Sequence, residues 1–423
     1  MTLSQDQSSP INNPNASLRR LIIPIYLPSM LMAVAQMALL IVLPLYILDL
    51  GSGVAEAAFV FAMRSLGSVL VNVPASLAIS QYGHRPSMAV ANVMMGLSAF
   101  IISISTSSWI IAISTLVFGA GMGTWLLARL AYITGQLPNH RRGTALATLA
   151  GLQRLGMFVG PLLGGLGVDN AGYSTVFAAI SLTALVTAAL VWCFTSSTLD
   201  QHPVDVRTPS PLQGFDPPPA GRRPAYSLFT LIPGIIGHYR TLFATAGTFV
   251  FALQLVREQR NLLMVLWGTN IDLDAETIGL IVSTAAAVDM AMFPLAGYIM
   301  DHWGRKVAGV SCIGFLSIAL GLLPLTSSML PYLLAGIIAG IGNGFGSGII
   351  LTMGADLAPK HERSQFLGVW RFVGDLGALA GPLLTSLSTS LIVALELSAL
   401  VGLTGGLILL CCVAETLSRR APQ

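Results

Sequence analysis

Apolar residues form long continuous runs along this chain, and short polar segments separate the runs. A helix needs roughly 20 apolar residues to cross a hydrocarbon core of about 30 Å, and the runs reach that length. They lack the alternation of a membrane β-strand, which argues against a closed barrel. The pattern predicts twelve transmembrane helices, near 21–48, 55–79, 88–106, 110–134, 144–166, 174–195, 239–267, 276–300, 307–326, 331–355, 366–387 and 390–413.

The second half of the chain repeats the first at a constant offset of 221 residues. Glycine and proline fix backbone geometry, so their recurrence predicts that the two halves bend and pack alike. We therefore expect an all-α membrane protein made of two pseudo-symmetric six-helix bundles. The pairs that share the offset are Gly83 and Gly304, Gly119 and Gly340, Gly121 and Gly342, Gly123 and Gly344, Gly156 and Gly377, Gly160 and Gly381, and Pro161 and Pro382.

The predicted organisation has five parts. A tail (1–20) precedes the first bundle (21–196), a linker (197–238) leads to the second bundle (239–414), and a second tail (415–423) follows. The linker is rich in Pro, Ser, Asp and Arg, a composition that cannot bury a core, so we expect it to act as a tether. The first tail is polar and has no apolar run with a cleavage site, so we expect no removable signal peptide.

Composition and charge indicate that lipid surrounds the chain. Only 9% of residues are charged, 54% are hydrophobic and the net charge is +3. Lys and Arg fall in the tails, the linker and the loops of one side, whereas the opposite loops carry Asp169, Asp272 and Asp274 instead. This bias predicts a multi-pass protein of the plasma membrane, most simply that of a bacterium, with both termini cytoplasmic. The net charge therefore reports topology, and we expect no nucleic-acid partner.

Candidate chemistry for an enzyme is sparse. The six histidines lie in or beside predicted cytoplasmic segments, and the four cysteines lack metal or redox spacing. The glycine-rich stretches 119–123 and 340–348 fall inside apolar helices, with no preceding strand and no phosphate-loop Lys, so they indicate close helix packing. We expect no cofactor, no metal and no enzymatic activity.

One loop resembles a signature of the major facilitator superfamily. After the eighth predicted helix, the segment Gly297, Asp301, Gly304, Arg305 and Lys306 is similar to the family's G-x-x-x-D-R-x-G-R-K pattern. The equivalent loop of the first half keeps only Gly83, His84 and Arg85, with Ser76 and Ser80 at the family's Gly and Asp positions. The resemblance covers nearly the whole chain and implies two bundles that alternate in opening a central cavity.

A second string, in the fifth predicted helix, resembles the G-x-x-x-G-P-x-x-G-G motif of the superfamily's proton-coupled exporters. The resemblance implies the 12-helix, drug:proton antiporter-like branch, which acts on small molecules, couples to protons and works as a monomer in the bilayer. Two positions depart from it: Thr115 stands where the exporters have an intramembrane Arg, and no acid lies in the middle of the first helix. The motif consists of Gly156, Gly160, Pro161, Gly164 and Gly165.

Charged residues inside the membrane are the stronger functional signal, because each costs several kcal/mol in lipid and normally faces the protein interior. The resemblance makes the third, sixth, ninth and twelfth helices peripheral, and of these only the twelfth carries a charge. The charged residues are Arg64, Arg129, Arg154, Arg257, Glu258, Arg260, Asp289, Arg371, Asp375 and Glu396.

Depth predicts which of these charges meet. Arg154 and Asp289 fall within about 3 Å of one level, and the resemblance places their helices side by side. We expect these two to pair, and Arg64 to pair with Glu258 or Asp375. Arg371 shares a helix face with Asp375 by i,i+4 spacing. Two interpretations stay open: the pairs hold the bundles together, or protonation of an acid releases an Arg and shifts the opening equilibrium. The coupling or gating candidates are Arg64, Arg154, Glu258, Asp289, Arg371 and Asp375.

Substrate contacts are predicted less sharply. Gln254, Arg257, Glu258 and Asn261 form one polar stripe on the seventh helix. The excess of Arg over acids favours an anionic or zwitterionic amphipathic solute. We expect a proton-coupled exporter of such a compound, or alternatively an uptake symporter or facilitator for an organic anion or metabolite; a receptor is disfavoured because no sizeable extramembrane domain is predicted. The remaining cavity candidates, for each aromatic of which plain packing is the alternative, are Gln36, Trp125, Arg129, Gln153, Asn343 and Trp370.

Overall fold

The first half of the chain folds into five long helical elements. The computed structural model describes residues 21–136, 139–195, 228–359 and 362–415, so the predicted tails 1–20 and 416–423 and most of the linker lie outside it. Within α6 the backbone leaves helical geometry at Gly172 (φ 79°, ψ 164°), so this element contains two spans. The elements are η2 (Ile22–Tyr26), α2 (Leu27–Asp49), α3 (Val54–Tyr82), α4 (His84–Ile104), α5 (Ser108–Gln136) and α6 (Asn139–Phe194).

The second half begins with a short helix that falls within the predicted linker, α7 (Leu228–His238). Ten described helices are long and apolar enough to cross a membrane. The second span of α6, and α9 with its three charged residues, complete the predicted twelve. The remaining elements are α8 (Arg240–Leu242), η4 (Phe243–Gly247), α9 (Thr248–Asn270), α10 (Ala275–His302), α11 (Arg305–Leu322), η5 (Leu323–Leu325), α12 (Met329–Phe345), α13 (Ile349–Leu357), α14 (Arg363–Leu387) and α15 (Leu391–Cys412).

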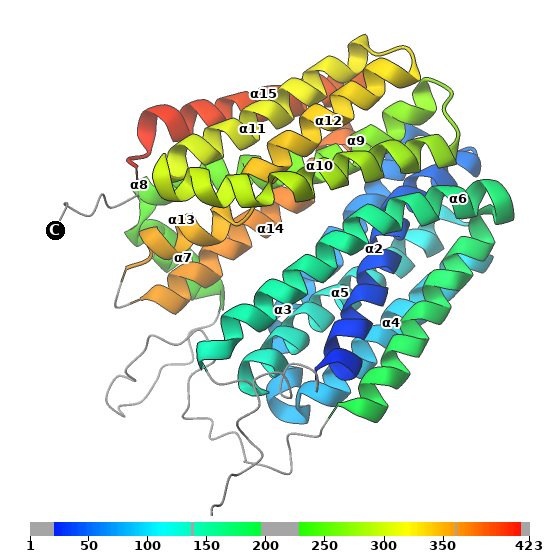
Figure 1. Cartoon of the computed structure of the whole chain (residues 1–423), viewed down its shortest axis with the longest axis horizontal. Helices are drawn as coiled ribbons and strands as arrows, with labels where there is room; N and C mark the ends of the chain where they lie inside the picture. The colour runs from blue at the N-terminus through cyan, green and yellow to red at the C-terminus, as the bar shows by residue number, and fades with distance from the viewer. Residues whose placement is uncertain (1–20, 137–138, 196–227, 360–361, 416–423) are drawn as a thin grey trace, which may run out of the picture.

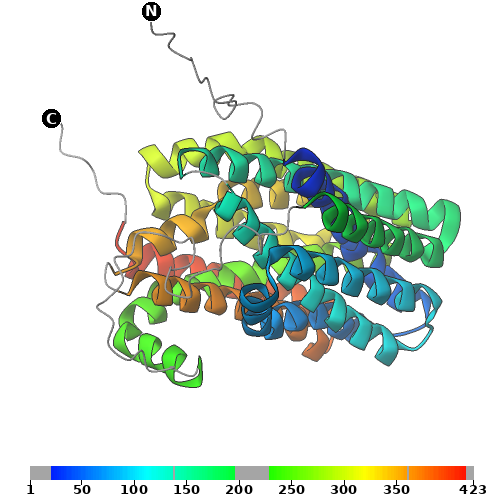
Figure 2. The same ribbon diagram turned by 90° about the horizontal axis from the view of Figure 1, so that it is seen from below.

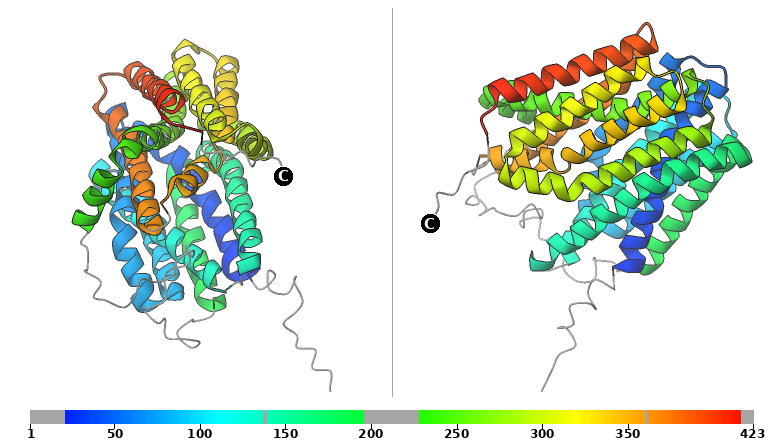
Figure 3. Two further views of the ribbon diagram at one scale, coloured as in Figure 1. Left: turned by 90° about the vertical axis from the view of Figure 1, so that its left-hand side faces the viewer. Right: turned by 45° about the horizontal axis from the view of Figure 1, so that its top comes forward.

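The helices assemble into two bundles that meet along two seams. In the first bundle α2 packs on α6, α3 on α5, and α4 on both α5 and α6. In the second, α9 packs on α14 and α15, and α12 packs on α10 and α11. The seams run between α6 and α10 and between α3 and α14 (Figures 1 and 3). The short helix α7 lies against α14 at the edge of the molecule (Figure 2).

The internal repeat appears directly in the helix contacts. Gly119 lies against the backbone of Arg64, and Gly340 lies against Ala285, the position 221 residues beyond Arg64. A methyl group at either glycine would overlap that backbone, so the lack of a side chain lets the helices approach closely. The prediction that the halves pack alike is confirmed. The same offset relates Gly121 on Ala91 to Gly342 on Cys312, Gly123 on Ser68 to Gly344 on Asp289, and Gly160 on Val34 to Gly381 on Leu255.

The predicted span near 331–355 is present as Met329–Leu357, but the structure breaks it into two helices. Helix α12 ends at Phe345 and α13 begins at Ile349, with Gly348 at φ 83°, a conformation that residues with a side chain rarely adopt. Three glycines in five residues, Gly344, Gly346 and Gly348, weaken the helix at this point.

Two glycines of the loop signatures have a clear backbone role. Gly83 (φ 88°) separates α3 from α4, and Gly304 (φ 105°) separates α10 from α11. Both need a conformation that favours glycine, which explains why the repeat preserves them. We call the end of the molecule that contains them the linker end, and the opposite end, which contains Gly172, the kink end.

Candidate functional site

A buried ion pair joins the two bundles through α3 and α9. The Nη2 atom of Arg64 lies 2.7 Å from Oε2 of Glu258. The same guanidinium lies 5.2 Å from the centre of the Phe61 ring and 3.8 Å from the sulfur of Met122. Of the two predicted partners of Arg64, the structure selects Glu258. Because Arg64 is only 8% exposed, loss of the Glu258 charge would leave an uncompensated buried cation.

The predicted pair between Arg154 and Asp289 is also present, across the α6/α10 seam. Their Nη1 and Oδ1 atoms are 3.4 Å apart, and the Asp289 side chain is 3% exposed. Asn343 donates a 2.5 Å hydrogen bond to the other Asp289 oxygen. The guanidinium also donates to Ser347 (2.9 Å) and stacks over Phe293 at 4.3 Å. The carboxylate of Asp289 therefore accepts from one donor in each bundle: the guanidinium of Arg154 in the first bundle and the neutral amide of Asn343 in the second.

The break between α12 and α13 holds an arginine from each bundle. Arg257 of α9 donates a 2.8 Å hydrogen bond to the carbonyl of Gly346, at the C-terminal end of α12. A cation is favourable there because the helix dipole places partial negative charge at a C-terminus. Ser347, the next residue, is the one that accepts from Arg154. Broken helices that collect charges near the middle of the bilayer are typical of transporter sites.

The second seam carries the opposite charge at the equivalent place. Asp375 on α14 lies 221 residues beyond Arg154, and it faces α3 as Arg154 faces α10. Asn72 of α3 donates to Asp375 Oδ2 at 3.4 Å, and Arg371 lies 3.8 Å away on the same helix. Among the described residues no cation from the first bundle pairs with Asp375. The two seams therefore have equivalent helix positions but opposite charges at them, Arg154 at the α6/α10 seam and Asp375 at the α3/α14 seam.

The predicted polar stripe of α9 is a real face of the helix. Gln254, Arg257, Glu258 and Asn261 are each partly exposed, whereas the residues between them are buried. Trp370 is different, because it is 2% exposed and packs against Phe366. In this conformation Trp370 belongs to the core.

The other predicted cavity residues are scattered. Gln36 of α2 makes a weak contact with the sulfur of Met95 at 3.7 Å, and Gln153 on α6 is partly exposed. Trp125 and Arg129 of α5 are each 2% exposed and lie 5.4 Å apart, measured from the guanidinium carbon to the ring centre. Trp125 and Arg129 are therefore closed off from any open cavity in this conformation.

The sequence analysis missed a buried polar residue that ties the second bundle together. Gln259 is fully buried, donates to Ser398 of α15 and accepts from Thr385 of α14, both at 2.9 Å. Its only sequence signal is an amide directly after the charged stripe. Ser347 and Asn72 were missed as well, because nothing in a serine or an asparagine of an apolar helix indicates a charged partner.

The kink end is closed across the α6/α10 seam. The carboxylate of Asp169 on α6 accepts a 2.6 Å hydrogen bond from the backbone amide of Glu276, in the first turn of α10. Gly165 lies directly against the backbone of Ala275, so the exporter-like motif supplies the close contact. Asp274 caps α10 from its own bundle by accepting from the backbone amide of Thr277 at 2.7 Å. Hydrogen bonds from the side chain and the backbone of Thr277 hold the pKa of Asp274 below its ordinary value.

The loop signature of the second half forms a clamp at the linker end. Arg305 lies 3.1 Å from Asp356 of α13 and 3.7 Å from Asp301. Glu415, beyond α15, accepts from the backbone amides of Arg305 (2.9 Å) and Lys306 (3.0 Å). Its carboxylate also lies where a side chain at Gly304 would point. Gly297, in contrast, has open space around its Cα.

The described residues form no equivalent clamp around the first copy of the signature. Arg85 instead stacks over the ring of Trp192, with its guanidinium carbon 4.6 Å from the ring centre. The serines at 76 and 80 bond to their own helix. The two linker-end loops therefore share backbone geometry, but only the second is locked by acids.

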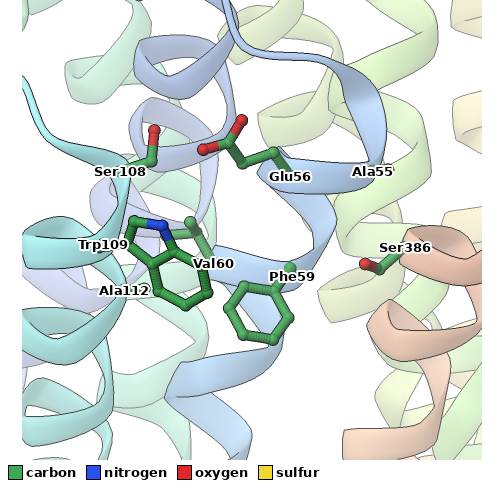
Figure 4. Close-up of a pocket in the computed structure, with 8 residues that line it drawn as sticks. All are labelled: Ala55, Glu56, Phe59, Val60, Ser108, Trp109, Ala112 and Ser386. Atoms are coloured by element: carbon green, nitrogen blue, oxygen red, sulfur yellow. The ribbon is translucent and has the colours of Figure 1, made fainter.

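A cavity of about 430 Å³ lies away from these charges, at the kink end of the α3/α14 seam (Figure 4). Glu56 and Phe59 of α3, Trp109 of α5 and Ser386 of α14 line it. Glu56 lies in the first turn of α3, where an acid complements the helix dipole, and Trp109 is 72% exposed, as is common for aromatic residues at a membrane surface. None of the predicted site residues lines this cavity.

Twelve spans in two related bundles, with paired charges at the seams between them, define a multi-pass secondary transporter. The sequence profile of the Major Facilitator Superfamily matches residues 25–382 and, in a second match, 259–423. The chain belongs to this superfamily, and the predicted resemblance is confirmed.

Relatives place the chain beside efflux pumps. It is 25% identical over 358 residues to the "Multi-drug resistance efflux pump PmrA homolog" of Lactococcus lactis, a match that covers 81% of this chain and 82% of that protein. Among solved structures, a POT family transporter in complex with 5-aminolevulinic acid aligns with a TM-score of 0.71 at 12% identity, over 96% of this chain and 97% of the other. The human organic anion transporter MFSD10 (TETRAN) aligns with a TM-score of 0.63 at 17% identity, over 93% and 99%. These structural likenesses show the fold.

Proposed function

We propose that this chain exports a small amphipathic organic compound by alternating access, driven by protons that enter in exchange. It would act as a monomer in the cytoplasmic membrane of a bacterium, with the linker end and both tails in the cytoplasm. The direction of transport is supported by the exporter-like motif in α6 and by the efflux pump named among the relatives. No ATP-binding motif is present in the sequence, so a gradient must supply the energy.

The proposal rests on two ion pairs between the bundles, Arg64 with Glu258 and Arg154 with Asp289. In each pair the first bundle supplies the cation and the second supplies the acid. Protonation of either acid removes the attraction but leaves the guanidinium buried, which destabilises the contact between bundles. A proton therefore favours the conformation in which the bundles have moved apart at that level.

Asp375 is proposed as a third protonation site. Its cross-seam contact is a neutral amide, so its proton can be gained or lost without breaking a cross-bundle ion pair. Arg371 stabilises the charged form from the same helix. A change of charge at Asp375 would thus alter its contact with Asn72 across the α3/α14 seam. The ion pairs of Asp289 and Glu258 would stay in place.

An uptake symporter or facilitator for an organic anion is the second candidate, favoured by three intramembrane arginines that form no ion pair with a described acid, Arg129, Arg257 and Arg260. Both functions need an anion-tolerant interior, and they differ in direction and in proton movement.

The test uses purified protein in proteoliposomes with an internal pH-sensitive dye and an imposed proton gradient. Compounds of one size in anionic, zwitterionic and cationic forms are added to wild type, Asp289→Asn, Asp375→Asn and the exposed control Asp272→Asn. The proposal expects a compound to dissipate the gradient in wild type and in the control, but not in the two variants. Gradient-independent flux of the same compound, unchanged in both variants, would refute it in favour of a facilitator.

A further inference from the structure

From the charges of the first bundle we infer that Arg129 and Trp125 form an anion site, which takes the carboxylate or similar oxyanion of an amphipathic compound. The inference deepens the proposed function by naming the substrate class.

The first bundle contains three arginines within the membrane, Arg64, Arg129 and Arg154, and none of its described acids pairs with them. Its acids in the described residues, Asp49, Glu56 and Asp169, lie at helix ends or at the kink end. The second bundle supplies Glu258 to Arg64 and Asp289 to Arg154. Arg129 has neither an ion pair nor a hydrogen bond among the described residues.

The absence of a partner for Arg129 among the described residues is significant because the residue is buried. Arg129 is 2% exposed, and its Nε has no hydrogen-bond partner. Its guanidinium lies over Trp125, whose own indole N–H is also buried without a partner. A buried cation with no counter-charge is strongly unfavourable, and so is a buried unsatisfied donor. A carboxylate has two oxygens that accept several hydrogen bonds, so one such group can satisfy both residues.

Arg257 and Arg260 also lack an ion pair with a described acid and each has a buried nitrogen without a partner, but each makes at least one hydrogen bond. Arg257 donates to the carbonyl of Gly346, and Arg260 donates to the side chain of Asn261. Within the described part of the chain, the guanidinium of Arg129 has only the face of the Trp125 ring, which stabilises a cation less than an anion does.

Position on α5 connects the site to the transport path. Arg129 follows Met122 by two helical turns on one face, and Met122 contacts the guanidinium of Arg64. The site therefore lies about 10 Å toward the linker end from the Arg64–Glu258 pair. Because Arg129 is occluded here, an anion would reach it when the surrounding helices separate during the transport cycle.

The test measures equilibrium binding of 1-naphthoate and 1-naphthamide to the full-length protein in nanodiscs, with no gradient imposed. The two probes share ring and shape and differ in charge. We expect wild type to prefer the acid, and Arg129→Gln to weaken acid binding by about 10- to 100-fold while leaving the amide unchanged. Arg129→Lys should retain part of the preference, because it keeps the charge and loses the planar fork. Arg240→Gln, which removes an exposed arginine, is the control.

The inference is overturned if wild type shows no preference for the acid, including no binding of either probe at millimolar concentration, or if Arg129→Gln keeps the preference. The wild-type comparison and Arg129→Lys decide the matter even if Arg129→Gln does not fold. The readout contains no proton step, so failure of proton coupling would leave the binding preference intact. Conversely, if the protein exports only a cation in exchange for protons, the proposed export function holds and the anion site at Arg129 is refuted.

Discussion

Neutralising Asp289 tests the α6/α10 seam most sharply. In an effective dielectric of about 20, unit charges 3.4 Å apart attract each other by about 5 kcal/mol. Desolvation of both groups offsets a large part of this attraction. Arg154 also keeps its bond to Ser347 and its stacking on Phe293, which reduces the loss further. We therefore expect Asp289→Asn to disfavour the state closed at the kink end by about 1.5–3 kcal/mol, roughly 10- to 150-fold in the equilibrium.

Spin labels at the linker end measure this equilibrium. Ser80 on α3 and Gln365 on α14 are exposed and lie on opposite sides of the second seam, so each can carry a label. When the kink end opens, the bundles approach at the linker end, and the distance between the labels should shorten. Pulsed EPR in nanodiscs then gives the fraction of each state, in a background where serine replaces the exposed native cysteines, Cys193, Cys411 and Cys412.

Two variants control the interpretation. Asp272→Asn removes an exposed acid near the kink end and should leave the distances unchanged. Arg154→Gln combined with Asp289→Asn should recover much of the wild-type distribution, because no unpaired charge remains. If Asp289→Asn changes the state ratio less than about twofold, or if the double variant is no closer to wild type than the single one, the ion pair does not hold this seam.

Three further predictions concern the backbone of the seams and loops. Gly165→Ala places a methyl group on the backbone of α10 and should cost about 1–3 kcal/mol in thermal unfolding, whereas Gly151→Ala, in open space on the same helix, should be neutral or slightly stabilising. Asp169→Asn weakens the cross-bundle cap by about 0.5–1 kcal/mol and should raise the kink-open fraction seen by EPR; an unchanged fraction would contradict the cap. Gly304→Ala should destabilise by at least about 1–2 kcal/mol because of its positive φ, but Gly297→Ala, in the same signature, should have almost no effect on the melting temperature, and equal effects would disprove the geometric argument.

The two ion pairs show which contacts the sequence could predict and which it could not. Depth along the helices predicted that Arg154 and Asp289 share one level, because rise per residue fixes the level of each charge, and the family resemblance placed their helices side by side. Depth left Arg64 with two acids, and only the docking of α3 against α9 selected Glu258. The choice between acids at one level depends on rotation of one bundle against the other, which no local pattern encodes.

Bilayer physics makes most of this fold readable from the sequence. Every span must be apolar for about 20 residues and satisfy its own backbone, so the runs of hydrophobic residues determined the twelve helices, and the repeated glycines determined that the halves pack alike. The cap from Asp169 and the lack of a counter-charge for Arg129 among the described residues were decided only by the tertiary structure. Each depends on which groups from distant segments do or do not arrive within about 3 Å, and that is set by the packing of whole bundles.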